Sequence, residues 1–367
     1  MPVITASHEF DVSDLFVNLQ PLFGRRLFLK VEGFNFAGSI KLKAAREMVA
    51  QAEAAGLLRP GSTLVESSSG NMGVALALLA AGRGYRFVCV TDTRCNAVTR
   101  RTMESLGAEV HVVTEPHETE GFLGARIRHV EALLAADDSR VWLNQYLSPG
   151  NWMAHYRTTA PAIARQFPDL NVLFVGAGTT GTLMGCARWF RERRPSVRVV
   201  AVDSVGSVTF GGPAGTRHIP GLGTSVRPAL LDEGLVDAVV HVPEAATVRT
   251  CRALMRHGFP VGGSTGTAVT GALRWLEEHY GDGAGGVREQ ITAVTVSPDL
   301  GDRYMETVYH DEWVRDAFGP GALAEPATGR AGLAEPADVA DLADVADLAG
   351  QGSAGATAPA AATAVAD

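Results

Sequence analysis

Short apolar runs alternate with amphipathic stretches along most of the chain, and this alternation predicts strands that are each followed by a helix. In the first half, the apolar runs typical of strands are 26–32, 63–66, 85–91 and 109–113. The stretches with helical spacing between and after them are 42–55, 74–81, 97–106 and 124–136. Strands that are apolar throughout are typical of a parallel sheet covered on both faces, so we expect an α/β domain.

The same pattern restarts after residue 146 and predicts a second α/β unit. Its expected strands are 172–175, 198–202 and 291–296, and its expected helices are 152–166, 182–192, 246–257 and 268–279. A Gly- and Pro-rich stretch of irregular pattern, 204–226, interrupts this unit. We expect the boundary between the two units near Tyr146, and a cleft between two such units is a common ligand site.

The end of the chain, 319–367, is composed mainly of Ala, Gly, Pro, Asp, Thr and Leu and contains a repeated Ala-Asp-Val-Ala-Asp-Leu unit. It has too little apolar bulk to offset the entropy of ordering, so we predict a disordered tail. Seven acidic residues against one basic residue give this tail −6 of the formal charge of −8, which leaves −2 for the remainder. A nearly neutral folded part argues against general nucleic-acid binding.

The sequence has no feature of a membrane or secreted protein. The first 20 residues contain no basic segment followed by an apolar core, and no apolar run is long enough to span a bilayer. The four cysteines lack CxxC spacing: Cys89, Cys95, Cys186 and Cys251. We therefore expect reduced structural thiols in a cytoplasmic protein, with no disulfide framework and no metal site.

Lys41 is the first candidate for chemistry, because it follows a Gly38-Ser39 turn at the expected start of a helix. The positive end of the helix dipole disfavours an ammonium at this position. The position suits an amine that loses its charge, which is what Schiff-base chemistry with a carbonyl compound requires. The alternative is an ordinary surface lysine on an amphipathic helix.

Three Gly- and Ser/Thr-rich turns precede expected helices, at 68–71, 176–182 and 262–267. The second matches GxGxxG with Asp203 after the next strand, which raises the alternative of an NAD-dependent enzyme. Its three threonines better fit a terminal phosphate, held by backbone N–H groups and hydroxyls. The first turn has the size of a carboxylate site, although any one of the three could be only an N-capped helix start.

Together these segments resemble the fold type II pyridoxal-phosphate family of cysteine synthase and cystathionine β-synthase, over roughly residues 10–315. The resemblance implies that Lys41 in Gly-Ser-Ile-Lys forms the Schiff base with pyridoxal 5'-phosphate. It implies that Asn71 contacts the phenolic oxygen of the cofactor and Ser264 its pyridine nitrogen. The implied phosphate loop is Gly178, Thr179, Thr180, Gly181 and Thr182. The implied substrate residues are Ser68, Ser69 and Gly70 for the α-carboxylate, together with Gln145.

Within this family the chain looks most similar to the enzymes of 2,3-diaminopropionate biosynthesis for siderophores and peptide antibiotics. The residues that carry this similarity are 144–146, 151–152, 155–156, 204–211, 220–223, 262–266 and 298–304. Those enzymes condense O-phospho-L-serine with L-glutamate by β-replacement, and the family resemblance also implies a homodimer. The sequence departs from the usual family pattern at Asn35-Phe36 and after Lys41, which affects the expected local packing but not the lysine.

The resemblance also implies a two-domain tryptophan synthase β-like architecture. We expect a larger cofactor domain of residues 1–38 and 146–318 and a smaller substrate-closing domain of residues 39–145. A serine at the pyridine nitrogen, in place of a carboxylate, makes the ring a weaker electron sink and favours β-replacement over transamination or racemisation. A leaving phosphate calls for a fixed guanidinium, for which Arg217 is the first candidate and Arg227 the second.

Three functions therefore compete at this point. The first is the β-replacing synthase that uses O-phospho-L-serine and L-glutamate. The second is cysteine synthase, which uses O-acetyl- or O-phospho-L-serine with sulfide. The third is a non-catalytic binding protein on the same fold, against which the intact lysine and loops argue. The NAD hypothesis is dropped, because it leaves Lys41, Asn71 and Ser264 unexplained.

Overall fold

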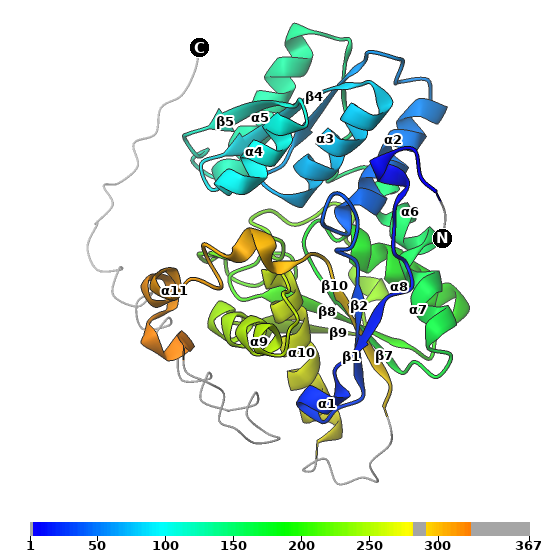
Figure 1. Cartoon of the computed structure of the whole chain (residues 1–367), viewed down its shortest axis with the longest axis vertical. Coiled ribbons are helices and arrows are strands. Elements are labelled where there is room, and N and C mark those ends of the chain that lie inside the picture. Colours follow the sequence, from blue (N-terminus) through cyan, green and yellow to red (C-terminus); the bar gives the residue numbers. More distant parts are fainter. Residues whose placement is uncertain (1–2, 282–290, 324–367) are drawn as a thin grey trace, which may run out of the picture.

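The computed structural model describes residues 3–281 and 291–323, which form two sheets with helices on both faces (Figure 1). One sheet has six strands in the order β1-β2-β10-β7-β8-β9, and the other has four strands in the order β5-β4-β3-β6. Every neighbouring pair is parallel except β1 and β2. In the described part of the chain, no helix is both long and apolar enough to cross a membrane.

The six-stranded sheet is buried because its strands present apolar side chains to both faces. Along β7 (Val172–Gly176), Val172 and Phe174 point into one apolar cluster, and Leu173 and Val175 into another on the opposite face. The other strands are β1 (Phe16–Asn18), β2 (Leu27–Val31), β8 (Arg198–Ser204), β9 (Ala238–Val242) and β10 (Ala293–Ser297). Such two-sided burial is what the continuous apolar runs predict.

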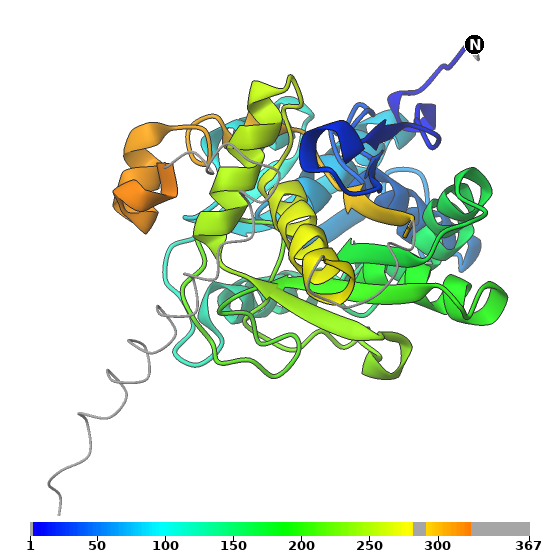
Figure 2. The same ribbon diagram turned by 90° about the horizontal axis from the view of Figure 1, so that it is seen from below.

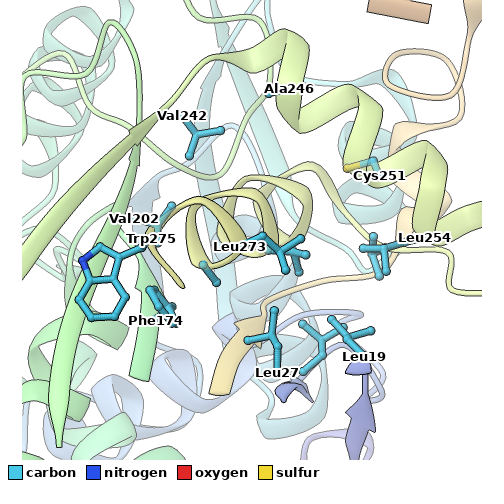
Figure 3. Packing of buried hydrophobic residues seen from close by; sticks show 14 of the residues in the cluster. Leu19, Leu27, Phe174, Val202, Val242, Ala246, Cys251, Leu254, Leu273 and Trp275 are labelled. Carbon is cyan, nitrogen blue, oxygen red and sulfur yellow. The ribbon is translucent and has the colours of Figure 1, made fainter. Parts of the chain in front are cut away.

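Helices α9 (Glu244–Arg256) and α10 (Gly263–Tyr280) cover one face of this sheet, and α7 (Thr159–Gln166) and α8 (Gly181–Arg193) cover the other. Figure 3 shows α10 among the buried side chains, with Trp275 against Phe174 at 5.5 Å between ring centroids. The remaining helices of this unit are α1 (Gln20–Phe23), α6 (Pro149–Arg157) and α11 (Asp311–Phe318). Helices α11 and α7 lie on opposite sides of the unit in both views (Figures 1 and 2).

The four-stranded sheet consists of β3 (Thr63–Ser67), β4 (Arg86–Asp92), β5 (Glu109–Val113) and β6 (Arg140–Trp142). Helices α2 (Lys41–Ala54), α3 (Asn71–Arg83) and α4 (Ala97–Ser105) contribute side chains to the apolar cluster on one face. Helix α5 (Gly121–Ala136) packs on the other face, where Val130 meets Val65, Val88 and Val90. Both sheets place the carboxyl ends of their strands beside the starts of the following helices.

The predicted α/β class with two mostly parallel sheets is confirmed, but several element predictions are wrong. The predicted helix 152–166 is two helices, because Pro161 has no N–H for the carbonyl of Arg157 and its ring would clash there. The predicted helix 268–279 begins earlier, at Gly263, so the Ser/Gly stretch is its first turn. Strand β9 and helix α11 were not predicted.

The predicted disordered tail lies outside the described residues from 324 onward. Its first residues, however, form a short 3₁₀ helix, Pro320–Leu323. Ala322 of that helix is buried in the apolar cluster beneath α9 and α11. Residues 320–323, which the prediction included in the tail, are therefore structured, because this segment contributes apolar contacts that its composition alone does not indicate.

Candidate active site

The candidate site forms where β10 ends and α2, α3, α8 and α10 begin. Ser39 pairs with Asp299 in an isolated antiparallel bridge, and the Ile40 N–H donates to the Pro298 carbonyl at 2.7 Å. These two contacts attach the turn that precedes Lys41 to the end of β10. Asn35 organises the same turn, because its amide donates to the Ser39 carbonyl at 2.9 Å and its side-chain oxygen accepts from the Ala37 N–H at 3.0 Å.

Lys41 is the first residue of α2, and its pKa is lowered. Desolvation of the amine is the main cause, while the nearby Asp299 carboxylate opposes it. Among the described residues, no carboxylate oxygen lies within 4.0 Å of this amine in an ion pair. A lysine that readily becomes neutral is nucleophilic, as Schiff-base chemistry requires.

The lysine two residues further along the helix is in a different environment. The Lys43 amine lies 2.6 Å from a Glu32 carboxylate oxygen and 3.7 Å from Asp11. Glu32 also pairs with the buried Lys30, at 3.3 Å. These ion pairs are inside the protein, so Lys43 holds α2 against β2, while Lys41 is left for other chemistry.

Asp299 joins the predicted site residues to one another. Its carboxylate accepts from Asn71 Nδ2 and from the Tyr304 hydroxyl, each at 2.8 Å, and from the Ser264 hydroxyl at 3.3 Å. The Arg303 guanidinium donates to Asn71 Oδ1. Asp299 is 1% exposed, and burial is the main cause of its raised pKa, against which its hydrogen-bond donors act.

Gly262 permits this arrangement at the start of α10. A Cβ atom at Gly262 would lie 2.0 Å from Asp299 Oδ1, which no side chain can accommodate. The Gly262 N–H donates to the Asp299 carbonyl at 3.1 Å. The first turn of α10, which carries Ser264, can therefore approach β10 closely only because residue 262 lacks a side chain.

The loop before α8 has the shape of an anion cup. Thr180 adopts a left-handed conformation, with φ of 65°, and precedes the first helical residue, Gly181. The first N–H groups of a helix have no partner within it, and the helix dipole favours an anion there. A Cβ atom at Gly178 would lie 2.8 Å from the Gly221 carbonyl oxygen, so the cup is lined by backbone.

Two buried side chains hold the threonines of this cup. Asn151 donates from Nδ2 to Thr179 Oγ1 at 2.9 Å and to the Gln145 carbonyl at 2.7 Å. His155 lies between Thr182 Oγ1, 3.2 Å from Nε2, and Thr159 Oγ1, 3.0 Å from Nδ1. Burial, followed by the nearby Lys41 and Lys43, lowers the pKa of His155 well below its usual value, so this imidazole is neutral.

These residues fit pyridoxal 5'-phosphate. The cup supplies N–H groups and hydroxyls for a phosphate, with a glycine-lined wall that a side chain would fill. Lys41 supplies an amine whose charge is disfavoured, and it is close enough to His155 behind the cup to lower the pKa of that residue. Ser264 and Asn71 lie within hydrogen-bonding reach of the same Asp299 carboxylate, so the structure brings together the predicted ring-contacting residues.

The predicted carboxylate loop, 68–70, opens α3 on the other sheet. Ser68 is buried, and its hydroxyl accepts from the N–H groups of Gly70 at 3.2 Å and Gly73 at 3.0 Å, so this hydroxyl shapes the turn. Gln145 is also buried and donates from Nε2 to the Ser67 carbonyl at 2.9 Å. Gln145 therefore connects the end of β6 to the residue that precedes this loop.

Glu66 lies beneath this loop. It is 0% exposed and accepts hydrogen bonds from the Ser67 N–H, from Trp142 Nε1 and from the Gln145 N–H, at 2.9, 3.1 and 3.1 Å. Burial raises its pKa to about 7, and these donors together with Arg126 act in the opposite direction. Glu66 thus fixes the carboxylate loop relative to Gln145.

The two candidate arginines differ in their surroundings. Arg217 is half-buried beside the 220–223 loop, and its guanidinium donates to the Gly206 carbonyl and, at 3.1 Å, to the Ser225 hydroxyl. Arg227 forms an ion pair with Glu233 at 2.5 Å on the surface.

The structure also bears on the dinucleotide alternative. Asp203 is 0% exposed and accepts from the Ser204 N–H at 2.8 Å, so it is not available for the ribose hydroxyl of a dinucleotide.

The role of several residues was missed at the level of sequence. Asp299 and Arg303 lie in a segment that carries the family resemblance, but neither was assigned a function. The available signal was an acidic residue shortly after a buried strand, where the carboxyl edge of a parallel sheet places ligand contacts. Glu66 is likewise at the carboxyl end of a buried strand, as the fourth of the five residues of β3.

Comparisons with known proteins agree with this geometry. The model of the family described as pyridoxal-phosphate dependent enzyme matches residues 16–286. N-(2-amino-2-carboxyethyl)-L-glutamate synthase of Ralstonia nicotianae is 38% identical over 310 residues, which is 84% of this chain and 87% of that protein. The protein of the same name from Cupriavidus metallidurans is 37% identical over 303 residues, 81% of this chain and 87% of that protein.

Solved structures show the same fold. O-ureido-L-serine synthase has a TM-score of 0.76 and 31% identity, covering 87% of this chain and 98% of that one. The O-acetylserine dependent cystathionine β-synthase from Helicobacter pylori has a TM-score of 0.75 and 26% identity, covering 84% of this chain and all of that one. The chain therefore belongs to the pyridoxal-phosphate dependent enzymes of the cysteine synthase type, and its cofactor is pyridoxal 5'-phosphate.

Proposed function

We propose that this enzyme catalyses a β-replacement in which O-phospho-L-serine and L-glutamate give N-(2-amino-2-carboxyethyl)-L-glutamate and phosphate. The observation that carries the proposal is the 37–38% identity, over more than four fifths of the chain, to two synthases of that name. In the net reaction the Cβ–O bond of phosphoserine breaks, phosphate leaves, and the glutamate nitrogen forms the new bond to Cβ.

The roles of the site residues follow from their positions. Bound pyridoxal phosphate supplies an electron-withdrawing ring that acidifies the α-carbon of an attached amino acid. Lys41 holds the cofactor and, once released, its Nζ takes the α-proton of the substrate. The backbone N–H groups and hydroxyls at residues 178–182 bind the cofactor phosphate, with Asn151 and His155 fixing the threonines.

The amino-acid substrate binds at the start of α3. The Ser69 hydroxyl and the N–H groups of Ser69 and Gly70 receive the α-carboxylate, because helix N-termini favour anions. Ser68 keeps this turn in shape, and Gln145 faces the same loop. We assign these contacts to a smaller domain, residues 39–145, that closes over the cofactor domain of residues 1–38 and 146–318.

Arg217 is our candidate for the leaving phosphate. Its guanidinium is held by the Gly206 carbonyl and the Ser225 hydroxyl beside the loop that borders the phosphate cup, so it is presented in a fixed orientation. A bidentate guanidinium distinguishes a phosphate from an acetyl leaving group. Arg227 is the weaker candidate, because Glu233 already neutralises it.

We further propose a cytoplasmic homodimer that provides 2,3-diaminopropionate units for a siderophore or a peptide antibiotic. These features derive from the family resemblance. Sedimentation at micromolar concentration tests the oligomeric state, and a species with the mass of a single chain would contradict the dimer.

The decisive experiment follows the visible absorbance of the holoenzyme during titration with O-phospho-L-serine. We expect the band of the lysine-bound cofactor to be replaced on addition of this substrate and to return on addition of L-glutamate, with one phosphate released per product. A spectrum that responds to O-acetyl-L-serine but not to O-phospho-L-serine, and recovers with sulfide, would instead identify a cysteine synthase. A spectrum unmoved by either amino acid would support the non-catalytic alternative.

A further inference from the structure

The side-chain amide of Asn71 is held from both sides by groups of opposite charge. Asn71 Nδ2 donates to Asp299 Oδ2 at 2.8 Å, and Asn71 Oδ1 accepts from the Arg303 guanidinium. Both partners come from the segment after β10, more than 220 residues along the chain from α3. The contacts therefore connect the start of α3, beside the four-stranded sheet, with the end of the six-stranded sheet.

The charges allow only one orientation of this amide. In the reverse orientation, the amide NH₂ would face the guanidinium and the amide oxygen would face the carboxylate, and both contacts would be repulsive. Asp299 is 1% exposed, so its interaction with the amide is weakly screened. With one hydrogen committed to Asp299, Nδ2 has a single hydrogen left for a ligand.

The two charged residues are themselves fixed. Asp299 also accepts from the Tyr304 hydroxyl at 2.8 Å, and its backbone pairs with Ser39. Arg303 donates to the Ala37 carbonyl at 2.8 Å, and its own carbonyl accepts from Asn96 Nδ2 at 3.0 Å. Asp299 and Arg303 together form a clamp on the Asn71 amide. This clamp is anchored to the turn before Lys41 and to the start of α4, so it does not rotate with Asn71.

We infer that Asp299 and Arg303 are positioning residues that orient the Asn71 amide so that its remaining hydrogen points to the ring oxygen of pyridoxal phosphate. This inference rests on the role proposed above for Asn71. Neither charged residue has to contact the cofactor for this effect. Their contribution is to remove the alternative orientation and the rotational freedom of Asn71 before the cofactor binds, which lowers the entropy lost on binding.

The test compares the affinities of the apoprotein for pyridoxal phosphate and for 3-deoxypyridoxal phosphate, which lacks the ring oxygen. The readout is the ratio of the two dissociation constants, measured by the absorbance of the bound aldehyde. We expect the wild-type protein to prefer the natural cofactor by about tenfold, the value of one hydrogen bond. Asn71→Ala abolishes this preference, and Asp299→Asn and Arg303→Met should reduce it to less than threefold.

A purely structural role of Asp299 or Arg303 gives a different ratio of the two dissociation constants. If either variant weakens both ligands equally and keeps the tenfold preference, the clamp does not act through Asn71 and the inference is wrong for that residue. If Asn71→Ala itself keeps the preference, Asn71 does not meet the ring oxygen and the inference is overturned. No amino-acid substrate is present, so these outcomes are independent of the proposed reaction.

Two features of the design exclude unfolding of a variant as the cause of a changed preference. Asp299→Asn preserves the shape of the side chain, and circular dichroism establishes that each variant retains the wild-type helix content. Asp302→Asn is the matched control, since Asp302 is an exposed carboxylate in the same turn, and its preference should equal that of the wild type. A double variant of Asn71→Ala with Asp299→Asn should show no further loss of preference, because the clamp then has nothing to orient.

Discussion

Replacement of Glu66 by glutamine tests how the protein holds the carboxylate loop. Glu66 is 0% exposed, and burial raises its pKa from 4.5 to about 7. A carboxyl group whose pKa is higher in the folded than in the unfolded state binds its proton more tightly when folded. Its stabilising contribution is therefore fully present below pH 4.5 and is lost as the pH rises through about 7.

The size of this effect follows from the difference between the two pKa values. Each unit corresponds to roughly 1.4 kcal/mol, so Glu66 should make the free energy of unfolding decrease by about 3 kcal/mol between pH 4.5 and pH 8. Glutamine cannot ionise, and the Glu66→Gln protein lacks this part of the pH dependence. The variant also sets an amide NH₂ against one of the three donors, which lowers its stability at all pH values.

Urea denaturation at pH 5 and pH 8, with saturating cofactor, measures the difference. We expect the wild type to lose about 2–3 kcal/mol more than Glu66→Gln over this interval. Glu115→Gln is the control, because Glu115 is an exposed carboxylate of the same unit and its removal should leave the pH dependence unchanged. Equal pH dependence in the wild type and Glu66→Gln would refute a raised pKa at this buried carboxyl group.

Three further outcomes are expected. Lys41→Ala should lower turnover by at least about 10³-fold and should leave no borohydride-reducible cofactor adduct by mass spectrometry, since among the described residues Lys41 is the lysine that begins a helix at this site. Arg217→Ala should reduce kcat/KM about 100-fold for O-phospho-L-serine but less than about tenfold for O-acetyl-L-serine, and equal losses would contradict its assignment. Asn151→Ala should weaken binding of pyridoxal phosphate about tenfold in equilibrium dialysis, because Thr179 loses its 2.9 Å contact.

The succession of strands and helices could be predicted from the sequence because it is set by local periodicity. Buried parallel strands such as β7 are apolar at each of their first four positions, and their helices begin where glycine and hydroxyl residues interrupt that pattern. The order of strands could not be predicted in this way. Strand β10 lies between β2 and β7, and the contacts that place it there join residues far apart in the chain.

The start of α10 shows why glycine-rich stretches are ambiguous. Local propensity favours a loop at 262–267, because glycine loses most entropy in a helix. The tertiary structure overrides this preference, since Gly262 must approach Asp299 and Gly263 must approach Ile219 more closely than any side chain permits. The same glycines that argue against a helix locally are therefore required for its packing.

The candidate site was predictable only in part, for a related reason. Lys41, Asn71, Ser264 and the 178–182 loop each occur in a local pattern that fits their chemistry. For Asp299 the local pattern offers only its place after a buried strand, and this place does not indicate which residues it contacts. The importance of Asp299 and Arg303 comes from the hydrogen bonds they make to Asn71, and such long-range contacts become visible only when both sheets are assembled.

The assembled site also explains how one chain can place an anion and a reactive amine at neighbouring helix starts. The start of α8 favours an anion, because the first N–H groups of a helix have no partner within it, whereas the start of α2 disfavours the charge on Lys41. Desolvation lowers the lysine pKa further, and the Asp299 carboxylate limits that decrease. Asp299 therefore acts on both sides of the site, because it preserves part of the basicity of the amine and also helps to orient Asn71. A neutral residue at position 299 could neither fix the orientation of the Asn71 amide by charge nor balance the charge of Lys41.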